Sequence, residues 1–204
     1  MIIHITGVSG SGKTSLGNKL RRTAKNTVVI DTDDIDDKNA TDIIENKKYN
    51  SYFCEKKMNK FFDLRAKMNY SDVKKIIKQC EDSNKTLIFI GLSFYGKADP
   101  INYADYKYYI DIEPEENFRY VTSRNIDDVC KECKNLKSLM KKETNPYKIQ
   151  MLILHKYKIR GGIRQMSQIV SNINFFKQKA QKDKYKIMSS DDIYNDVIDK
   201  IKQS

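Results

Sequence analysis

The sequence lacks tryptophan, has only three prolines and two histidines among 204 residues, and contains no long hydrophobic run. A membrane-spanning helix needs about 20 consecutive apolar residues, so we expect that this chain is not an integral membrane protein. The amino-terminal residues lack the basic region and cleavage site of a signal peptide, which favours a cytoplasmic location. Four cysteines without such a signal favour reduced thiols over a disulfide scaffold. Because no repeat, Pro-rich linker or low-complexity tail divides the chain, we predict one domain over residues 1–204.

Acidic residues are the minority: 27 aspartates and glutamates stand against 38 lysines and arginines, a net charge of +11. The imbalance is uneven. Residues 131–164 hold ten basic residues and two glutamates, whereas residues 31–45 hold seven acidic residues and one lysine. Each run alone is compatible with a solvated face. Together, an acidic and a basic segment in one small domain favour an enzyme that holds a metal ion beside a polyphosphate.

Hydrophobic patterns predict alternating strands and helices. Short apolar runs predict buried parallel strands at residues 2–5, 27–30, 86–91, 106–112 and 185–188. Helical spacing predicts a helix over residues 13–24, helices between the second and third strands, and a last helix capped by Ser190. This alternation predicts a three-layer α/β fold with a five-stranded parallel sheet. His4, inside the first strand, is expected to be a packed core histidine.

A glycine-rich motif follows the first predicted strand. Residues 7–14, Gly-Val-Ser-Gly-Ser-Gly-Lys-Thr, match G-x-x-x-x-G-K-[ST] between a strand and a helix. Glycines let the chain turn tightly and bring backbone N–H groups onto phosphate oxygens, while the helix presents its positive end. Lys13 is expected to reach the outer phosphates, and the Thr14 hydroxyl to ligate Mg²⁺. We therefore expect ATP and Mg²⁺ as cofactors, with ATP bound by Gly7, Ser9, Gly10, Ser11, Gly12, Lys13, Thr14 and Ser15.

The position of the carboxylates separates the classes of phosphate-binding protein. Motor and helicase ATPases carry an acid at the end of an apolar strand deep in the domain, whereas the strand at residues 86–91 ends without one. Here the acids follow the second strand, as Asp31, Asp33 and Asp34. We expect this strand end to open beside the phosphate loop, at the carboxyl edge where ligands bind. The pattern thus favours a kinase.

The chain resembles the P-loop kinases of the nucleoside-monophosphate-kinase and shikimate-kinase type. The resemblance spans nearly the whole length. It comprises residues 7–14, Asp31-x-Asp33, the strand at residues 87–91, the pattern at residues 109–116 with Arg119 and Arg124 after it, and the terminal strand and helix from Tyr185. The phosphate loop is the specific motif among these. The resemblance implies a P-loop fold with a helical lid insertion at about residues 125–165 and acceptor-binding helices at about residues 36–84.

The resemblance also assigns roles to individual residues. The second carboxylate of the Asp-x-Asp pair lies by the acceptor hydroxyl in such kinases, which implies that Asp33 receives its proton; a helix-capping or solvated aspartate is the alternative. Asp31 is the predicted partner that holds metal or water. The two lid arginines are expected at ATP, with Arg124 the favoured catalytic contact to the phosphates and Arg119 a nucleotide-binding residue.

The sequence therefore predicts an ATP-dependent phosphotransferase whose small acceptor is a nucleoside or nucleotide. Asp-Asp after the second strand is also similar to the polynucleotide 5′-kinases, for which the basic segment 131–164 would bind nucleic acid. A non-catalytic module whose nucleic-acid binding depends on ATP is the third possibility. The sequence leaves the oligomeric state open.

Overall fold

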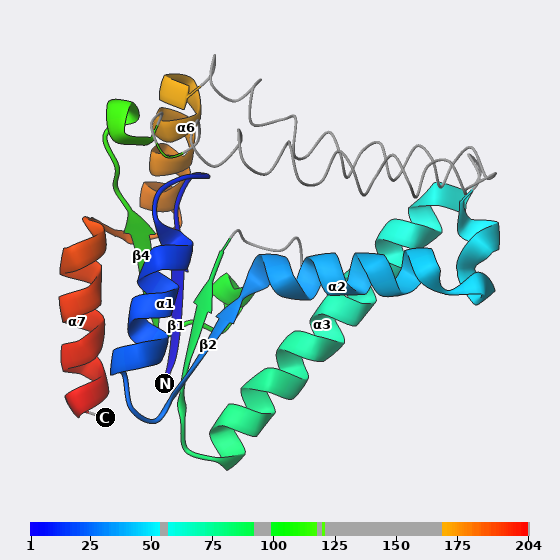
Figure 1. The fold of residues 1–204 in the computed structure, drawn as a ribbon, viewed down its shortest axis with the longest axis horizontal. Helices are drawn as coiled ribbons and strands as arrows, with labels where there is room; N and C mark the ends of the chain where they lie inside the picture. The colour runs from blue at the N-terminus through cyan, green and yellow to red at the C-terminus, as the bar shows by residue number, and fades with distance from the viewer. Residues whose placement is uncertain (54–56, 92–98, 118–119, 121–168, 204) are drawn as a thin grey trace.

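The computed structural model describes residues 1–53, 57–91, 99–117, 120 and 169–203. Five strands form one all-parallel sheet in the order β2-β3-β1-β4-β5, which confirms the predicted α/β fold (Figure 1). The strands are β1 (Ile2–Thr6), β2 (Thr27–Asp31), β3 (Thr86–Ile90), β4 (Tyr106–Ile110) and β5 (Lys186–Met188). The central strand β1 pairs with β3 on one side and β4 on the other. The glycine-rich loop follows the central strand β1 and leads into the next helix.

Helices α1 (Lys13–Thr23) and α7 (Ser190–Gln203) cover one face of the sheet. Alternate strand residues point to opposite faces, so Ile3 and Ile5 of β1 pack with Leu16 and Leu20 of α1 in the main core. These four side chains are at most 2% exposed. Burying a side chain of this size stabilises the fold by about 1.5–3 kcal/mol. This core fixes the start of α1 at the carboxyl edge of the sheet.

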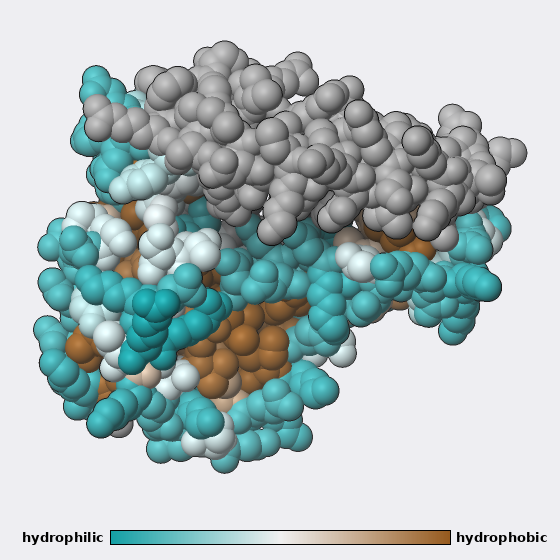
Figure 2. Space-filling view, viewed as in Figure 1, coloured by the Kyte–Doolittle hydropathy of each residue, from teal (hydrophilic) through white to brown (hydrophobic). Residues whose placement is uncertain are grey.

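Helices α3 (Met58–Asp82) and α6 (Ile169–Lys182) pack on the opposite face. Val73 and Ile77 of α3 pack on Phe89 of β3, whereas Ala180 of α6 packs on Tyr109 of β4. Strand β2 forms one edge of the sheet. Figure 2 shows hydrophobic residues at the surface between α1 and α3, near this edge.

Helices α2 (Thr32–Glu45) and α3 extend away from the sheet, joined by the 3₁₀ helix η1 (Lys47–Tyr52) and the segment after it (Figure 1). Ile43, Phe53 and Phe61 form a small separate core at their far end. The predicted acceptor-binding segment, about residues 36–84, covers most of this pair of helices. Helix α2 begins directly after β2, at Thr32, so the expected acids lie in its first turn instead of in a loop.

Three details differ from the sequence-based expectations. Strand β4 ends at Ile110, two residues before the predicted end at residue 112. The following helix does begin at Pro114, as the Pro-Glu-Glu pattern predicts. Ser189, not Ser190, caps α7, because its hydroxyl accepts a hydrogen bond from the Asp192 N–H at 3.2 Å. Strand β3 also separates β2 from β1, so the end of β2 is not the immediate neighbour of the phosphate loop.

Several predictions lie outside the described residues: Arg119, Arg124, the lid at about residues 125–165 and the basic segment 131–164. Within the part of the chain that the structure describes, no helix is long and apolar enough to cross a membrane.

Candidate functional site

The glycine-rich loop joins β1 to α1 in a tight turn. The Ser11 N–H donates to the Val8 carbonyl at 3.1 Å, and the Gly12 carbonyl accepts the Leu16 N–H at 2.9 Å in the first turn of α1. Gly10 and Gly12 have φ angles of 79° and 86°, which glycine adopts without the steric cost that other residues incur. The N–H groups in the first turn of a helix have no acceptor within the helix, and at the start of α1 they adjoin this loop, as an anion site requires.

Lys13, the first residue of α1, folds back over the loop. Its Nζ donates to the carbonyls of Gly7 and Val8 at 2.9 and 2.8 Å. The buried Ser11 hydroxyl has no hydrogen-bond partner among the described residues, and a Cβ on Gly7 would approach its Oγ to 2.5 Å. A cation and helix N–H groups at one short loop fit a polyphosphate, and Thr14 and Ser15, both exposed, continue the same turn.

Asp31 joins the second strand to the acceptor helices. It is the N-cap of α2, and its carboxylate accepts the Asp33 N–H at 3.0 Å. Burial raises the pKa of Asp31, and the charges of Asp33 and Asp34 raise it further, whereas the Asp33 N–H and the Lys13 cation lower it. Lys13 is the last and smallest of these influences on the Asp31 pKa, and β3 lies between the strands that lead to the two residues. A carboxylate is a ligand type that Mg²⁺ accepts, although the described residues contain no group of three or more His, Cys, Asp or Glu side chains that could hold a metal ion.

Gly91 lies against the start of α2, beside Asp31 and Thr32. It follows β3 directly, with a φ of 141°. A Cβ at this position would collide with Thr32 Oγ1 and lie 3.1 Å from the Asp31 carboxylate. The absence of a side chain on Gly91 therefore makes room for the start of α2 at the carboxyl edge of the sheet.

Asp33 and Asp34 are both exposed in the first turn of α2. Asp36, one turn after Asp33, accepts a bidentate hydrogen bond from Arg65 of α3, with Arg65 Nε at 2.6 Å, and a third from Asn69 at 2.8 Å. Asn39 donates to Asn69 at 2.9 Å and to Asp72 at 3.0 Å. This polar network, Asp36, Asn39, Arg65, Asn69 and Asp72, fixes α2 against α3 beneath the predicted acceptor carboxylate.

Sequence reasoning missed the polar network. Its members recur at helical spacing, three apart on α2 and three or four apart on α3, which was the available signal. Pairing the two sets required knowing that α2 and α3 are antiparallel neighbours.

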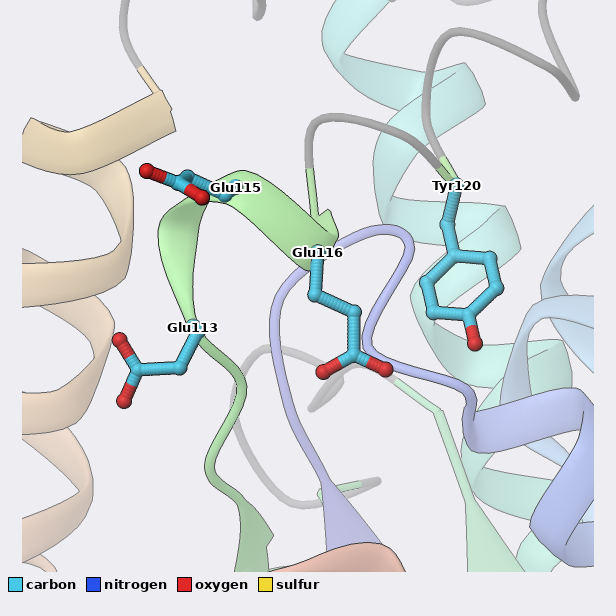
Figure 3. A pocket seen from close by; sticks show the side chains of 4 residues that line it. All are labelled: Glu113, Glu115, Glu116 and Tyr120. Carbon is cyan, nitrogen blue, oxygen red and sulfur yellow. The ribbon is translucent and has the colours of Figure 1, made fainter.

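The segment after β4 also contacts the loop. Asn117, which is 2% exposed, donates from Nδ2 to the Ser9 carbonyl at 2.7 Å. Beside it, Glu113, Glu115, Glu116 and Tyr120 line a pocket of ≈400 Å³ (Figure 3). Carboxylates repel a polyphosphate, so this pocket does not suit phosphate as the glycine-rich loop does.

No protein-family model matches the sequence. No curated protein matches it either. Among solved structures, the chain is similar to the shikimate kinase from Bacteroides thetaiotaomicron, with 16% identity, a TM-score of 0.36, and coverage of 89% of this chain and 98% of that one. At this level of similarity we attach no function to the likeness, and the fold rests on the strand order and pairing.

Proposed function

We propose that this protein is an ATP-dependent phosphotransferase that transfers the γ-phosphoryl group of ATP to a small acceptor, a nucleoside or nucleotide. The observation that carries the proposal is the contact of Lys13 with the glycine-rich loop. Its Nζ donates to the Gly7 and Val8 carbonyls, and at the end of the second strand Asp31 caps the helix that carries Asp33. Phosphoryl transfer needs mainly positioning and charge neutralisation, which this arrangement supplies.

The proposal assigns each residue a separate role. Backbone N–H groups of the loop and of the first turn of α1 would bind the phosphates, and Lys13 would exchange its two carbonyl partners for phosphate oxygens. Thr14 and Asp31 would hold Mg²⁺, which supplies charge neutralisation when it is bound. Asp33 would orient the acceptor hydroxyl and accept its proton. Arg119 and Arg124 stay proposed phosphate contacts.

The test is a transfer assay with γ-labelled ATP and Mg²⁺ against nucleosides, nucleoside monophosphates and an oligonucleotide with a free 5′-hydroxyl. We expect label on a small acceptor, and loss of transfer in Lys13→Ala. Lys19→Ala is the matched control, since Lys19 also lies on α1 but pairs with Asp191 at 3.2 Å on the surface. Label only on the oligonucleotide would identify the polynucleotide 5′-kinase instead. Near-normal turnover in Lys13→Ala would exclude the proposed phosphate site.

A further inference from the structure

The hydrogen bond from Asn117 to the Ser9 carbonyl is the contact in this region that the proposed function does not use. Asn117 lies in the helix that begins at Pro114, where its own N–H donates to the Glu113 carbonyl at 2.9 Å. Its side-chain Nδ2 reaches Ser9 at 2.7 Å, and the residue is 2% exposed. The buried Asn117 side chain, in the first turn of the helix after β4, thus binds the backbone of the glycine-rich loop at Ser9.

Hydrophobic packing fixes the base from which Asn117 acts. Val8 of the loop is 5% exposed and packs with Ile173 of α6 and with Ile112, which precedes the Asn117 helix. The loop and the segment after β4 are therefore neighbours through a small core as well as through one hydrogen bond. Because the packing acts on the Val8 side chain, it does not determine which way the next carbonyl points.

The orientation of the Ser9 carbonyl determines that of the next N–H. The described residues contain no cis peptide bond, and in a planar trans peptide the C=O and N–H point in opposite directions. Fixing the Ser9 carbonyl toward Asn117 therefore directs the Gly10 N–H away from Asn117. Among the described residues this N–H has no hydrogen-bond acceptor. In this orientation it would donate to an anion bound at the loop.

Gly10 is the position at which the Ser9–Gly10 peptide would rotate most easily if Asn117 did not hold it. Its φ is 79°, and glycine adopts positive and negative φ about equally well, so the Ser9–Gly10 peptide can rotate at little steric cost. A rotated peptide would present a carbonyl oxygen, in place of an N–H, to a bound phosphate. The glycine that permits the tight loop is therefore also the reason that the loop needs an external hydrogen bond.

We propose that Asn117 is a positioning residue that locks the Ser9–Gly10 peptide plane, so that the Gly10 N–H faces bound phosphate. This inference rests on the proposed phosphate site at the loop. It assigns Asn117 no contact with the nucleotide, and it predicts that the residue acts on the phosphates and not on the base.

The experiment compares Asn117→Ala with the exposed control Asn174→Ala on α6. Affinities for Mg·ATP and for Mg·tripolyphosphate are measured by calorimetry at a temperature where circular dichroism shows the folded state. We expect Asn117→Ala to weaken both ligands equally, by about ten-fold, because one buried hydrogen bond is lost. The control should bind both as the wild type does. Asn117→Leu, which keeps the side-chain volume but has no donor, should match Asn117→Ala and serves if that variant does not fold.

The other outcomes overturn the inference. Unchanged affinity in Asn117→Ala or Asn117→Leu, even with a lower melting temperature, would leave the residue a structural role only. A loss for ATP without a loss for tripolyphosphate would mean that Asn117 acts on the nucleoside part. If the wild type itself bound neither ligand, the proposed phosphate site and this inference would both fail, which distinguishes that result from the first two.

Discussion

Thr32 and Gly91 occupy adjoining positions at the carboxyl edge of the sheet, where the first residue of α2 lies over the end of β3. Gly91 has a φ of 141°, and a Cβ there would overlap Thr32 Oγ1. Thr32 is fully buried, so its side chain has no room to yield. This contact fixes the start of α2, and with it the Asp31 carboxylate that caps the helix, at the end of the neighbouring strand β3.

Gly91→Ala is therefore expected to destabilise the protein and to shift the start of α2. A backbone conformation reserved for glycine costs roughly 1–3 kcal/mol in another residue, and the collision with Thr32 adds to that cost. Gly12→Ala is the comparison, because Gly12 has a φ of 86° but nothing within 4 Å of its Cβ position. Urea unfolding should give a larger loss for Gly91→Ala than for Gly12→Ala. Equal losses would show that contact with Thr32 has no energetic weight.

Asp33→Asn is expected to lower the turnover number by at least about 100-fold, in line with the contribution of a general base. Affinity for ATP should change little, because Asp33 lies on α2 and not on the phosphate loop. Asp34→Asn is the matched control, since Asp34 is also exposed in the first turn. Steady-state kinetics with the acceptor found in the transfer assay measures both. An inactive Asp34→Asn beside a normal Asp33→Asn would shift the catalytic role to the neighbouring residue.

The existence of all five strands followed from the sequence, because each is a short apolar run between polar segments. Their order did not. Strand β3 lies between β1 and β2, and α3 packs Val73 and Ile77 on Leu87 and Phe89; these contacts join distant segments, so no local pattern encodes them. The cap of α7 was displaced by one residue for a simpler reason: two adjacent serines are equally good caps by composition.

The glycine-rich loop between β1 and α1 was predictable because it is a continuous motif whose geometry depends on its own glycines. The contacts that support it are not continuous. Asn117 and Ser9 are 108 residues apart, and Arg65 and Asp36 are 29 apart. Pairs of this kind arise from the packing of whole elements, so spacing identified the loop and the carboxylates but not the side chains that hold them.

Asn69→Leu is expected to lower the free energy of unfolding by about 2 kcal/mol, because it removes the link between Asp36 and Asn39 and leaves buried polar atoms without partners. Asn69 is 5% exposed, donates to Asp36 at 2.8 Å and accepts from Asn39 at 2.9 Å. Asn59→Leu, on the exposed surface of the same helix, is the control. Chemical denaturation measures both variants, and a loss no larger than that of the control would mean that the polar network contributes nothing to holding α2 on α3.

The His4 ring confirms the expectation of a packed core histidine. It is fully buried in the central strand, and its Nδ1 lies 2.7 Å from the Tyr185 hydroxyl. Burial, the largest cause, lowers the pKa of His4 from 6.5 to about 4; the Gly91 backbone opposes this shift and the Lys107 cation adds to it. The folded state therefore keeps this imidazole neutral at pH values where the unfolded chain would protonate it.

Stability should consequently fall as the pH falls from 6.5 toward 4. In this window the unfolded state binds a proton at His4 and the folded state does not, so acid favours unfolding; the contribution is complete above the unfolded pKa and amounts to about 3 kcal/mol. Because carboxylates also titrate there, the quantity to measure is the difference in unfolding free energy between wild type and His4→Gln at each pH. That difference should shrink as the pH is lowered to 4. The same difference between wild type and His155→Gln, at the second histidine of the chain, is the reference. A wild-type advantage over His4→Gln that stays constant from pH 7 to 4 would show that His4 is protonated as readily in the fold as in the unfolded chain.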